Sequence, residues 1–319
     1  MPGPGRSRRF FRFVFSSQPA KLISSADCSE PVPSCNQQTL KILRSPTATL
    51  AACVSAPRPL VLVPTMGALH EGHAALIRKA RSIAGATGTV VVSIFVNPSQ
   101  FGPKEDLSRY PRPFAKDKAL CKMEGVGLLF APTPEGMYPG DFSTWVDESS
   151  VSVGLCGGAR PGHFRGVCTV VLKLFQICQP THAVFGRKDF QQCAVVSRMV
   201  RDLNMPVRLV FEETVRESDG LALSSRNAYL SKEERAQAVV LHQALQEART
   251  AARGGVRSTA ELRHILEARI ATAPLARADY LALVDQKTLQ PLQTAAPGCV
   301  AAVAVFFGKT RLIDNLRLL

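Results

Sequence analysis

The sequence predicts an α/β protein: a doubly wound parallel sheet followed by a smaller α+β domain. Short apolar strands alternate with helical segments as far as about residue 211, which is typical of a parallel sheet. The composition then changes near Glu212, and two helical segments precede the last three predicted strands. Since 319 residues are enough for two domains, we expect a leader over 1–39, a larger domain over 40–213 and a smaller lid domain over 214–319.

The first 39 residues have the composition of a leader. They are rich in Arg, Ser, Pro and Phe, and the first acidic residue is Asp27. This composition matches an organellar transit peptide, and an extension without a targeting role is the alternative. We therefore expect a cytoplasmic protein, or a mitochondrial one if the leader directs import.

Secretion, membrane insertion and nucleic-acid binding are not expected. The nine cysteines include no Cys-x-x-Cys pair and several lie in apolar runs, as buried thiols in a reducing compartment do. No apolar stretch reaches the ~18 residues of a membrane span. The net charge of +14 suits anionic small molecules. It does not indicate nucleic-acid binding, because the sequence has no Lys/Arg run with interleaved aromatic residues of the kind that tracks nucleic acid.

The larger domain is predicted from alternating patterns. Apolar runs predict strands over 60–63, 89–96, 127–131, 181–186 and 207–211. Helices are predicted over about 37–55, from residue 74, within 106–124, over 167–178 and through about 202, whereas 132–166 reads as a Pro-, Gly- and Ser-rich loop.

The smaller domain begins with a compact loop over 220–227. Two capping boxes, Ser231 to Glu234 and Ser258 to Glu261, predict helices that run to about Ala252 and to a point before Pro274. Strands are predicted over 280–284, 300–307 and 310–313.

The stretch 60–73, Leu-Val-Leu-Val-Pro-Thr-Met-Gly-Ala-Leu-His-Glu-Gly-His, connects a buried strand to a helix. It places His70 and His73 at a helix start, where unpaired N–H groups and the helix dipole favour phosphate oxygens. Glycines allow close approach of the backbone to a ligand, and imidazoles donate hydrogen bonds to phosphate. A zinc pair and two ordinary surface histidines are alternatives, although no further zinc ligand occurs nearby at a familiar spacing.

Polar side chains also follow two other strands and begin the second domain. Strand ends of an open α/β sheet are where ligands bind, so we expect these residues to converge: Asn97, Gln100, Lys188, Asp189, Gln192, Ser224, Ser225 and Arg226. Each segment alone also fits a surface ion pair or a plain turn. Together they suit a triphosphate and a hydroxy acid.

Six stretches resemble the pantoate–β-alanine ligase family, which has a Rossmann-like nucleotidyltransferase fold. The resemblance covers about residues 40–319. The stretches are Pro-Thr-Met-Gly-Ala-Leu-His-Glu-Gly-His at 64–73, Ser-Ile-Phe-Val-Asn-Pro-Ser-Gln-Phe at 93–101, Arg-Pro-Gly-His-Phe-Arg-Gly at 160–166, Phe-Gly-Arg-Lys-Asp-Phe-Gln-Gln at 185–192, Asp-Gly-Leu-Ala-Leu-Ser-Ser-Arg-Asn at 219–227 and Arg-Leu-Ile-Asp-Asn at 311–315.

The resemblance implies a two-step ligation. The pantoate carboxylate attacks the α-phosphate of ATP to give pantoyl adenylate and pyrophosphate, and β-alanine then gives pantothenate and AMP. It implies catalytic roles for His70, His73 and Lys188. The implied ATP-binding residues are Met66, Gly67, Ala68, Leu69, His70, Glu71, Gly72, His73, Gly186, Arg187, Lys188, Asp189, Val215, Leu223, Ser224, Ser225 and Arg226.

The other implied features concern pantoate, the metal and assembly. Pantoate would be held by Gln100 and Gln192 with Asn97 in support, and its gem-dimethyl group would face Val167, Val170 and Val171. Mg²⁺ is expected with ATP, held largely by phosphates and water, and its protein ligands are unknown. A homodimer is expected.

Two positions depart from the family pattern. Arg187 stands where the family usually has Glu or Gln, and Cys156 stands where Glu is expected. The second departure puts the amine-binding step in question. A different adenylyltransferase of the same fold, a nucleic-acid-binding protein and an inactive homologue are the alternatives. The first of these would have no reason to keep Gln100 and Gln192, and an inactive homologue no reason to keep His70, His73, Lys188 and Arg226.

Overall fold

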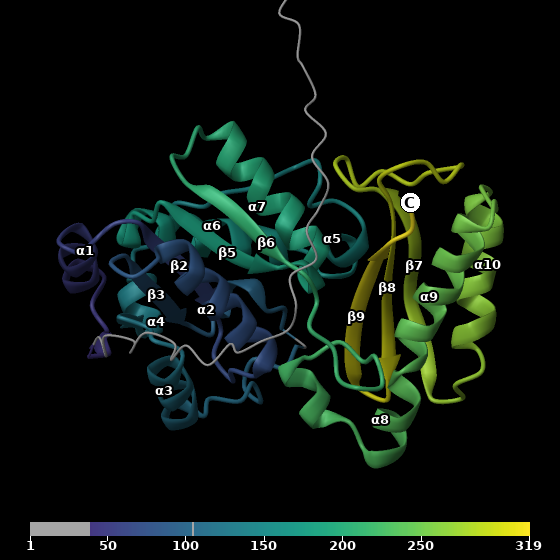
Figure 1. The fold of residues 1–319 in the computed structure, drawn as a ribbon, viewed down its shortest axis with the longest axis horizontal. Coiled ribbons are helices and arrows are strands. Elements are labelled where there is room, and N and C mark those ends of the chain that lie inside the picture. Colours follow the sequence, from purple (N-terminus) through teal and green to yellow (C-terminus); the bar gives the residue numbers. More distant parts are fainter. Residues whose placement is uncertain (1–38, 104) are drawn as a thin grey trace, which may run out of the picture. The chain divides into compact units, whose positions relative to one another are not determined.

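The computed structural model describes residues 39–103 and 105–319. It contains a six-stranded parallel sheet and a separate three-stranded antiparallel sheet (Figure 1). The parallel strands are β1 (Lys41–Leu43), β2 (Leu60–Thr65), β3 (Thr89–Ile94), β4 (Leu128–Phe130), β5 (His182–Gly186) and β6 (Arg208–Glu212). The antiparallel strands are β7 (Ala276–Asp285), β8 (Cys299–Phe307) and β9 (Thr310–Arg317).

Ten α-helices and three 3₁₀ turns connect these strands in the described part of the chain. The helices are α1 (Pro46–Val54), α2 (Glu71–Ala84), α3 (Phe114–Met123), α4 (Pro134–Met137), α5 (Leu155–Ala159), α6 (His163–Cys178), α7 (Phe190–Asp202), α8 (Lys232–Ala238), α9 (Val240–Arg253) and α10 (Thr259–Ile270). The 3₁₀ turns are η1 (Pro98–Gln100), η2 (Arg187–Asp189) and η3 (Ser225–Tyr229).

The parallel sheet is covered by helices on both faces, as the prediction of a doubly wound fold requires. Its strand order is β1-β4-β3-β2-β5-β6. Successive side chains of a strand point to opposite faces, so Leu60 and Leu62 of β2 pack with α1, α6 and α7, whereas Val61 and Val63 pack with α2 and α3. Because both faces are buried at the centre of the sheet, β2 and β3 are largely apolar runs, whereas the edge strands β1 and β6 begin with exposed Lys41 and Arg208.

The strand order brings the predicted site loops together. β3, β2 and β5 are neighbours and parallel, so their carboxyl ends lie at one edge of the sheet. The loop before α2 follows β2, the turn η1 follows β3, and the turn η2 follows β5. The parallel sheet therefore places His70, Gln100 and Lys188 on the same side.

The antiparallel sheet has its own helical layer. Its order is β7-β8-β9, and α9 and α10 pack on one face (Figure 1). Leu241 and Leu245 of α9 and Leu262 and Leu266 of α10 are fully buried in a core shared with β8. This arrangement confirms the predicted α+β half.

The predicted helix over 37–55 is wrong in its first part, because residues 41–43 form strand β1. This strand pairs in parallel with β4, where Lys41 lies opposite Leu128 and Leu43 opposite Phe130. A strand of three residues is too short to show a hydrophobic periodicity in the sequence, and its pairing with the distant strand β4 specifies it. The helix itself begins at Pro46, after Ser45 accepts a hydrogen bond from the backbone of Ala48.

Several other boundaries also differ from the prediction. The predicted 132–166 loop contains the short helices α4 and α5, and the helix expected from residue 167 begins at His163. The helix expected over 231–252 is broken at Val239 between α8 and α9, where two β-branched valines follow each other and helix propensity is low. The Ser231–Glu234 capping box is present, whereas Ser258 accepts from Glu261 as a simple N-cap.

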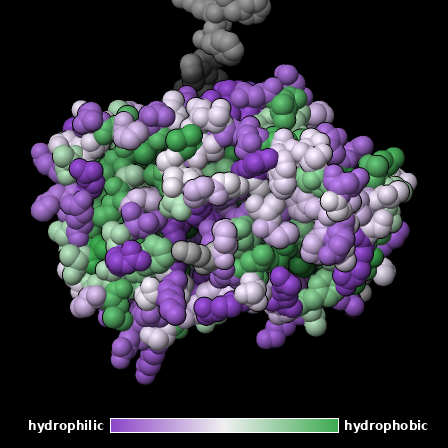
Figure 2. Space-filling view, turned by 180° about the vertical axis from the view of Figure 1, so that it is seen from behind, coloured by the Kyte–Doolittle hydropathy of each residue, from purple (hydrophilic) through white to green (hydrophobic). Residues whose placement is uncertain are grey.

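The structure does not test the predicted leader or the predicted domain boundary. The leader over 1–39 falls almost wholly outside the described residues, and the boundary at 213 stays a prediction. Among the described residues, no helix is both long enough and apolar enough to cross a membrane. Figure 2 shows hydrophilic and hydrophobic side chains intermixed over the face that it displays.

Gly166 tests the packing of α6 against η1. A Cβ at this position would lie 2.5 Å from the Ser99 carbonyl oxygen and 2.7 Å from the Gln100 nitrogen, both backbone atoms. Gly166→Ala should therefore lower the free energy of unfolding by roughly 1–3 kcal/mol, measured by urea denaturation. Gly158→Ala is the control, because its Cβ would meet nothing within 4 Å. Equal stability of the two variants would contradict this packing.

Candidate active site

The loop between β2 and α2 is held by a buried carboxylate. Asp117 of α3 accepts hydrogen bonds from the backbone N–H groups of Ala68 (2.9 Å) and Leu69 (2.8 Å). Gly67 has φ +83° and its Cβ would lie 3.0 Å from the Asp117 carboxylate, so this position requires glycine. Burial raises the pKa of Asp117 above its usual value, and the two N–H groups partly offset this shift.

His70 and His73 form reciprocal contacts at the start of α2. His70 Nδ1 accepts the backbone N–H of Gly72 at 3.2 Å, and His73 Nδ1 accepts the backbone N–H of His70 at 3.3 Å. The two ring centroids are 4.1 Å apart. Because Nδ1 is an acceptor in each ring, the proton of each neutral imidazole is assigned to Nε2.

Both histidines are neutral at pH 7. Burial, followed by the positive charge of Lys188, lowers the pKa of His70 to about 4. Burial, followed by His70 and Lys188, lowers the pKa of His73 to about 3. Each ring therefore offers one Nε2–H donor without a formal charge.

The η1 turn presents two amides that fix each other. Asn97 Nδ2 donates to Gln100 Oε1 and to the Gly166 carbonyl oxygen, each at 3.1 Å. Gln100 Nε2 lies 3.0 Å from Met66 Sδ. The orientation of the Gln100 amide is thus set by α6 and by the loop after β2.

The η2 turn and the start of α7 supply the next wall. Lys188 Nζ is 3.9 Å from the Asp189 carboxylate, and the Lys188 side chain is 22% exposed. Gln192 lies one turn further along, on α7. These three side chains line the same cavity as the two histidines.

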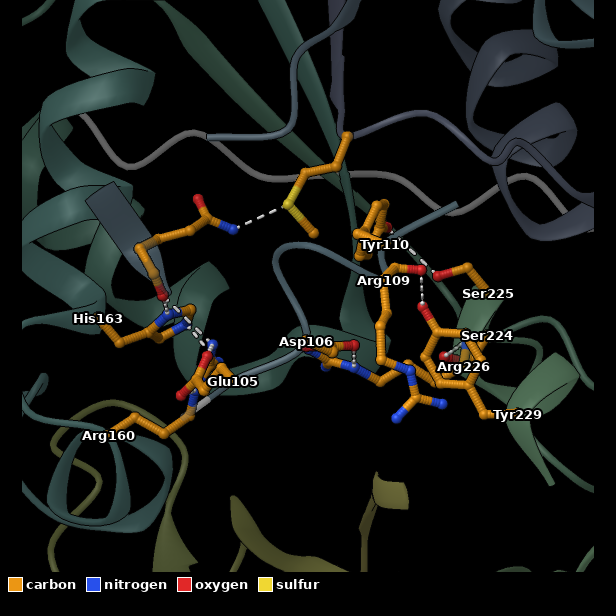
Figure 3. A network of polar contacts seen from close by, with 12 residues as sticks. Glu105, Asp106, Arg109, Tyr110, Arg160, His163, Ser224, Ser225, Arg226 and Tyr229 are labelled. Carbon is orange, nitrogen blue, oxygen red and sulfur yellow. Dashed lines mark hydrogen bonds and ion pairs between the residues drawn. The ribbon is translucent and has the colours of Figure 1, made fainter. Parts of the chain in front are cut away.

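Two adjacent carboxylates pair with two arginines of the cavity wall (Figure 3). Asp106 accepts two hydrogen bonds from Arg226, at 3.0 and 3.1 Å. Glu105 likewise accepts two from Arg160, at 2.5 and 2.7 Å. Burial alone would raise the pKa of each carboxyl, but its arginine holds the pKa below the usual value.

His163 continues the Glu105–Arg160 network toward η1 (Figure 3). Its Nε2 is 3.0 Å from Arg160 Nη1, and its Nδ1 is 2.8 Å from the Gln100 carbonyl oxygen. Since arginine can only donate, Nε2 accepts and Nδ1 carries the proton. Burial, followed by the charge of Arg160, lowers the pKa of His163 to about 4.

These elements enclose a cavity of about 240 Å³. It brings together eighteen of the predicted site residues: Met66, His70, Gly72, His73, Asn97, Gln100, Val167, Val170, Val171, Gly186, Lys188, Asp189, Gln192, Val215, Leu223, Ser224, Ser225 and Arg226. The three valines lie on α6 and form an apolar part of the wall.

Five predicted ATP-binding residues lie outside this lining. Gly67, Ala68 and Leu69 form the loop that Asp117 holds. Glu71 is 59% exposed and pairs with Arg78. Arg187 pairs with Glu213, at 3.0 Å between Nε and the carboxylate. Their contacts with ATP stay predictions.

Sequence reasoning missed several residues of the site. Tyr110, Arg160 and His163 line the cavity, and Tyr110 Oη is 3.3 Å from Ser225 Oγ. Arg160 and His163 belong to a basic, glycine-rich stretch that also fits a surface loop, and the family resemblance gave neither residue a role in the site. Neither Tyr110 nor Asp117 carries a local signal.

The departure at Cys156 lies beside the main cavity. Its Sγ is 3.2 Å from Tyr280 Oη and 3.6 Å from Arg311 Nη1, at a smaller cavity of about 60 Å³. Arg311 in turn pairs with Asp279 at 2.8 Å. The thiol thus occupies a place next to a guanidinium group, where a glutamate would form an ion pair.

The chain is similar to known ligases over most of its length. A sequence profile of the Pantoate-beta-alanine ligase family matches residues 38–317. The chain belongs to the pantoate–β-alanine ligase family. It is 53% identical to the pantothenate synthetase of Heliobacterium modesticaldum over 259 residues, which cover 81% of this chain and 91% of that protein.

Solved structures of ligase family members share its fold. Pantothenate synthetase from Thermus thermophilus superposes with a TM-score of 0.83 at 48% identity, covering 87% of this chain and 99% of that one. The pantoate–β-alanine ligase of Francisella tularensis, solved with β-γ ATP and β-alanine, has a TM-score of 0.72 at 31% identity over 88% and 98% of the two chains. These similarities confirm the predicted fold class.

The lowered histidine pKa values predict a pH-dependent stability. Below pH 6.5 the folded state binds fewer protons than the unfolded state. The contribution of the buried, neutral histidines to the free energy of unfolding is therefore fully present above that pH and is lost as the pH falls toward 3. For His73 the loss at pH 5 should reach about 2 kcal/mol. His73→Asn should remove the His73 share of this loss, measured as the free energy of unfolding in urea at pH values between 7.5 and 5. His264→Asn, at an exposed position of α10, should leave it unchanged, and an unaltered slope in His73→Asn would contradict the assignment.

Proposed function

We propose that this cavity is the active site at which the chain carries out the reaction of its family. The reaction is the ATP-dependent ligation of D-pantoate and β-alanine to pantothenate through pantoyl adenylate, with release of pyrophosphate and AMP. The observation that carries the assignment is the convergence of two imidazole donors, one lysine and two glutamine amides on one space. The first three suit phosphate oxygens, and the amides suit a hydroxy acid.

The triphosphate lies against His70, His73 and Lys188 in this proposal. Each neutral imidazole donates its Nε2–H to a phosphate oxygen, and Lys188 neutralises charge as the α-phosphate is attacked. The residues over 223–226 close over the nucleotide from the second half of the chain. Attack at phosphorus depends on positioning and electrostatics more than on covalent help, and the cavity supplies both.

Pantoate lies between Gln100, Gln192 and the α6 valines. Its carboxylate oxygen bonds to the α-phosphorus, and the bond from that phosphorus to the departing pyrophosphate breaks. The gem-dimethyl group packs on Val170 and Val171, because an apolar group needs apolar side chains that the two glutamines do not provide. Asn97 keeps the Gln100 amide oriented.

β-Alanine completes the reaction in the second step. Its amine bonds to the acyl carbon, AMP leaves with the bonding electron pair, and the amine loses a proton. The adenylate is sensitive to water, so enclosure by both halves of the chain protects it. Cys156 lies in the smaller cavity, and we expect the second step to proceed despite this departure.

The metal, the assembly and the compartment complete the proposal. No group of three or more His, Cys, Asp or Glu side chains within 39–103 and 105–319 is placed to hold a metal ion. The cavity lining includes the carboxylates of Asp189, beside Lys188, and Glu213, which pairs with Arg187. Mg²⁺ would therefore be bound chiefly through ATP phosphates and water, where it offsets their charge. We further propose a homodimer, located in the cytoplasm or, if 1–39 directs import, in mitochondria.

The first experiment measures pyrophosphate release with ATP and D-pantoate, with and without β-alanine, together with AMP and pantothenate. Sustained turnover should require both substrates. His73→Ala should slow pyrophosphate release by at least about 10²-fold, as loss of a transition-state donor does, while the fold is kept.

His264→Ala is the matched control, since this histidine is exposed on α10. Near wild-type turnover of His73→Ala would refute its role. Pyrophosphate release without any pantothenate would keep the adenylation site but locate a defect in the amine step near Cys156.

Gln192 tests the location of pantoate. Gln192→Ala should raise the KM for pantoate by about 10-fold or more, the cost of a lost hydrogen bond to a charged group, with a smaller change for ATP. Steady-state kinetics with each substrate varied would measure this difference. Gln243→Ala, an exposed position on α9, serves as control. An effect on ATP alone would place pantoate elsewhere.

A further inference from the structure

The C-terminal strand β9 carries one family-like stretch, 311–315, to which the proposed reaction gives no role. Asn315 lies within it and reaches across to the parallel sheet. Its Nδ2 donates to the Arg187 carbonyl oxygen at 2.9 Å and to the Lys188 carbonyl oxygen at 3.0 Å. Both amide hydrogens are therefore used on the η2 turn.

The η2 turn depends on such contacts. It has three residues and no side-chain cap at its start, and isolated 3₁₀ turns have poor internal hydrogen-bond geometry. Two of its carbonyl groups are satisfied by Asn315. The backbone from which the Lys188 side chain extends is thus fixed by a residue of the other sheet.

Asn315 is itself rigidly placed. Its backbone N–H donates to Asp314 Oδ1 at 2.8 Å. Asp314 is buried and accepts two hydrogen bonds from Arg216, at 2.6 and 2.9 Å. Arg216 also donates to the Gly220 carbonyl oxygen at 3.1 Å and forms a β-bridge with Ala222.

One short piece of β9 therefore contacts both loops that face the proposed nucleotide. Asn315 holds the turn of Lys188, and Asp314 holds, through Arg216, the segment that leads to Ser224. The geometry assigns Asn315 as a positioning residue that sets the place of the Lys188 ammonium group. This inference rests on the proposed role of Lys188 in adenylation.

A positioning role and a purely structural role predict different couplings. If Asn315 only ties the two sheets together, its loss should slow adenylation by the same factor whether or not Lys188 is present. If it acts through Lys188, its loss should have little further effect once the lysine is removed. A double-mutant cycle separates the two cases.

The experiment uses single-turnover pyrophosphate release with the full chain in excess over ATP and with saturating D-pantoate. Asn315→Leu keeps a similar volume and removes both donors without adding a charge, and Asn315→Ala is the second variant in case the first fails to fold. Each is made alone and in Lys188→Ala. Arg317→Ala is the control, since this side chain of the same strand contacts the Leu319 carbonyl.

Lys188→Ala should slow adenylation by about 10²–10³-fold. Each Asn315 variant should slow it by about 10- to 100-fold in the wild-type chain, because small displacements of a catalytic group have effects of this size. In Lys188→Ala the further change caused by either Asn315 variant should be less than about twofold.

The outcomes distinguish the two proposals. Equal slowing by the Asn315 variants in both backgrounds, or no slowing in the wild-type chain, overturns the inference and leaves the role of Lys188 intact. Unchanged adenylation in Lys188→Ala refutes the proposed role of Lys188, and the inference falls with it.

Discussion

The site depends on one interaction, in which the Asp117 carboxylate receives the N–H groups of Ala68 and Leu69. The chain leaves β2 with positive φ at Gly67 and Ala68, a conformation that L residues rarely adopt without support. The carboxylate provides that support. It thereby fixes where α2 begins, and the two histidines obtain their places and their tautomers from that first turn.

Charge inside the cavity is balanced unevenly. Asp106 and Glu105 neutralise two arginines in close pairs, whereas the carboxylate beside Lys188 lies 3.9 Å from its ammonium group. Burial, and after it the nearby charge of Lys188, lowers the pKa of His70 and His73 and keeps both rings neutral. The cavity therefore combines one loosely paired ammonium group with uncharged Nε2–H donors.

The parts of the fold with local signals could be predicted from sequence. The 64–73 loop has its strand, its glycines and its helix start within about fourteen residues, so His70 and His73 were identified together. Strand β1 had no such signal, because its three residues are specified by pairing with β4. Asp117 was missed for the same reason: its partners lie 48 and 49 positions away, and an acid on a helix usually faces solvent.

The bond between Asn315 and the Lys188 turn joins groups 127 positions apart in the sequence. Contacts of such separation close large loops, which costs chain entropy and slows folding. A chain still being synthesised can complete β2, β3 and β5 long before β9 exists. The cavity proposed for adenylation is therefore complete only after translation has passed residue 315, so a partly made chain lacks the fully formed site that the proposed reaction needs.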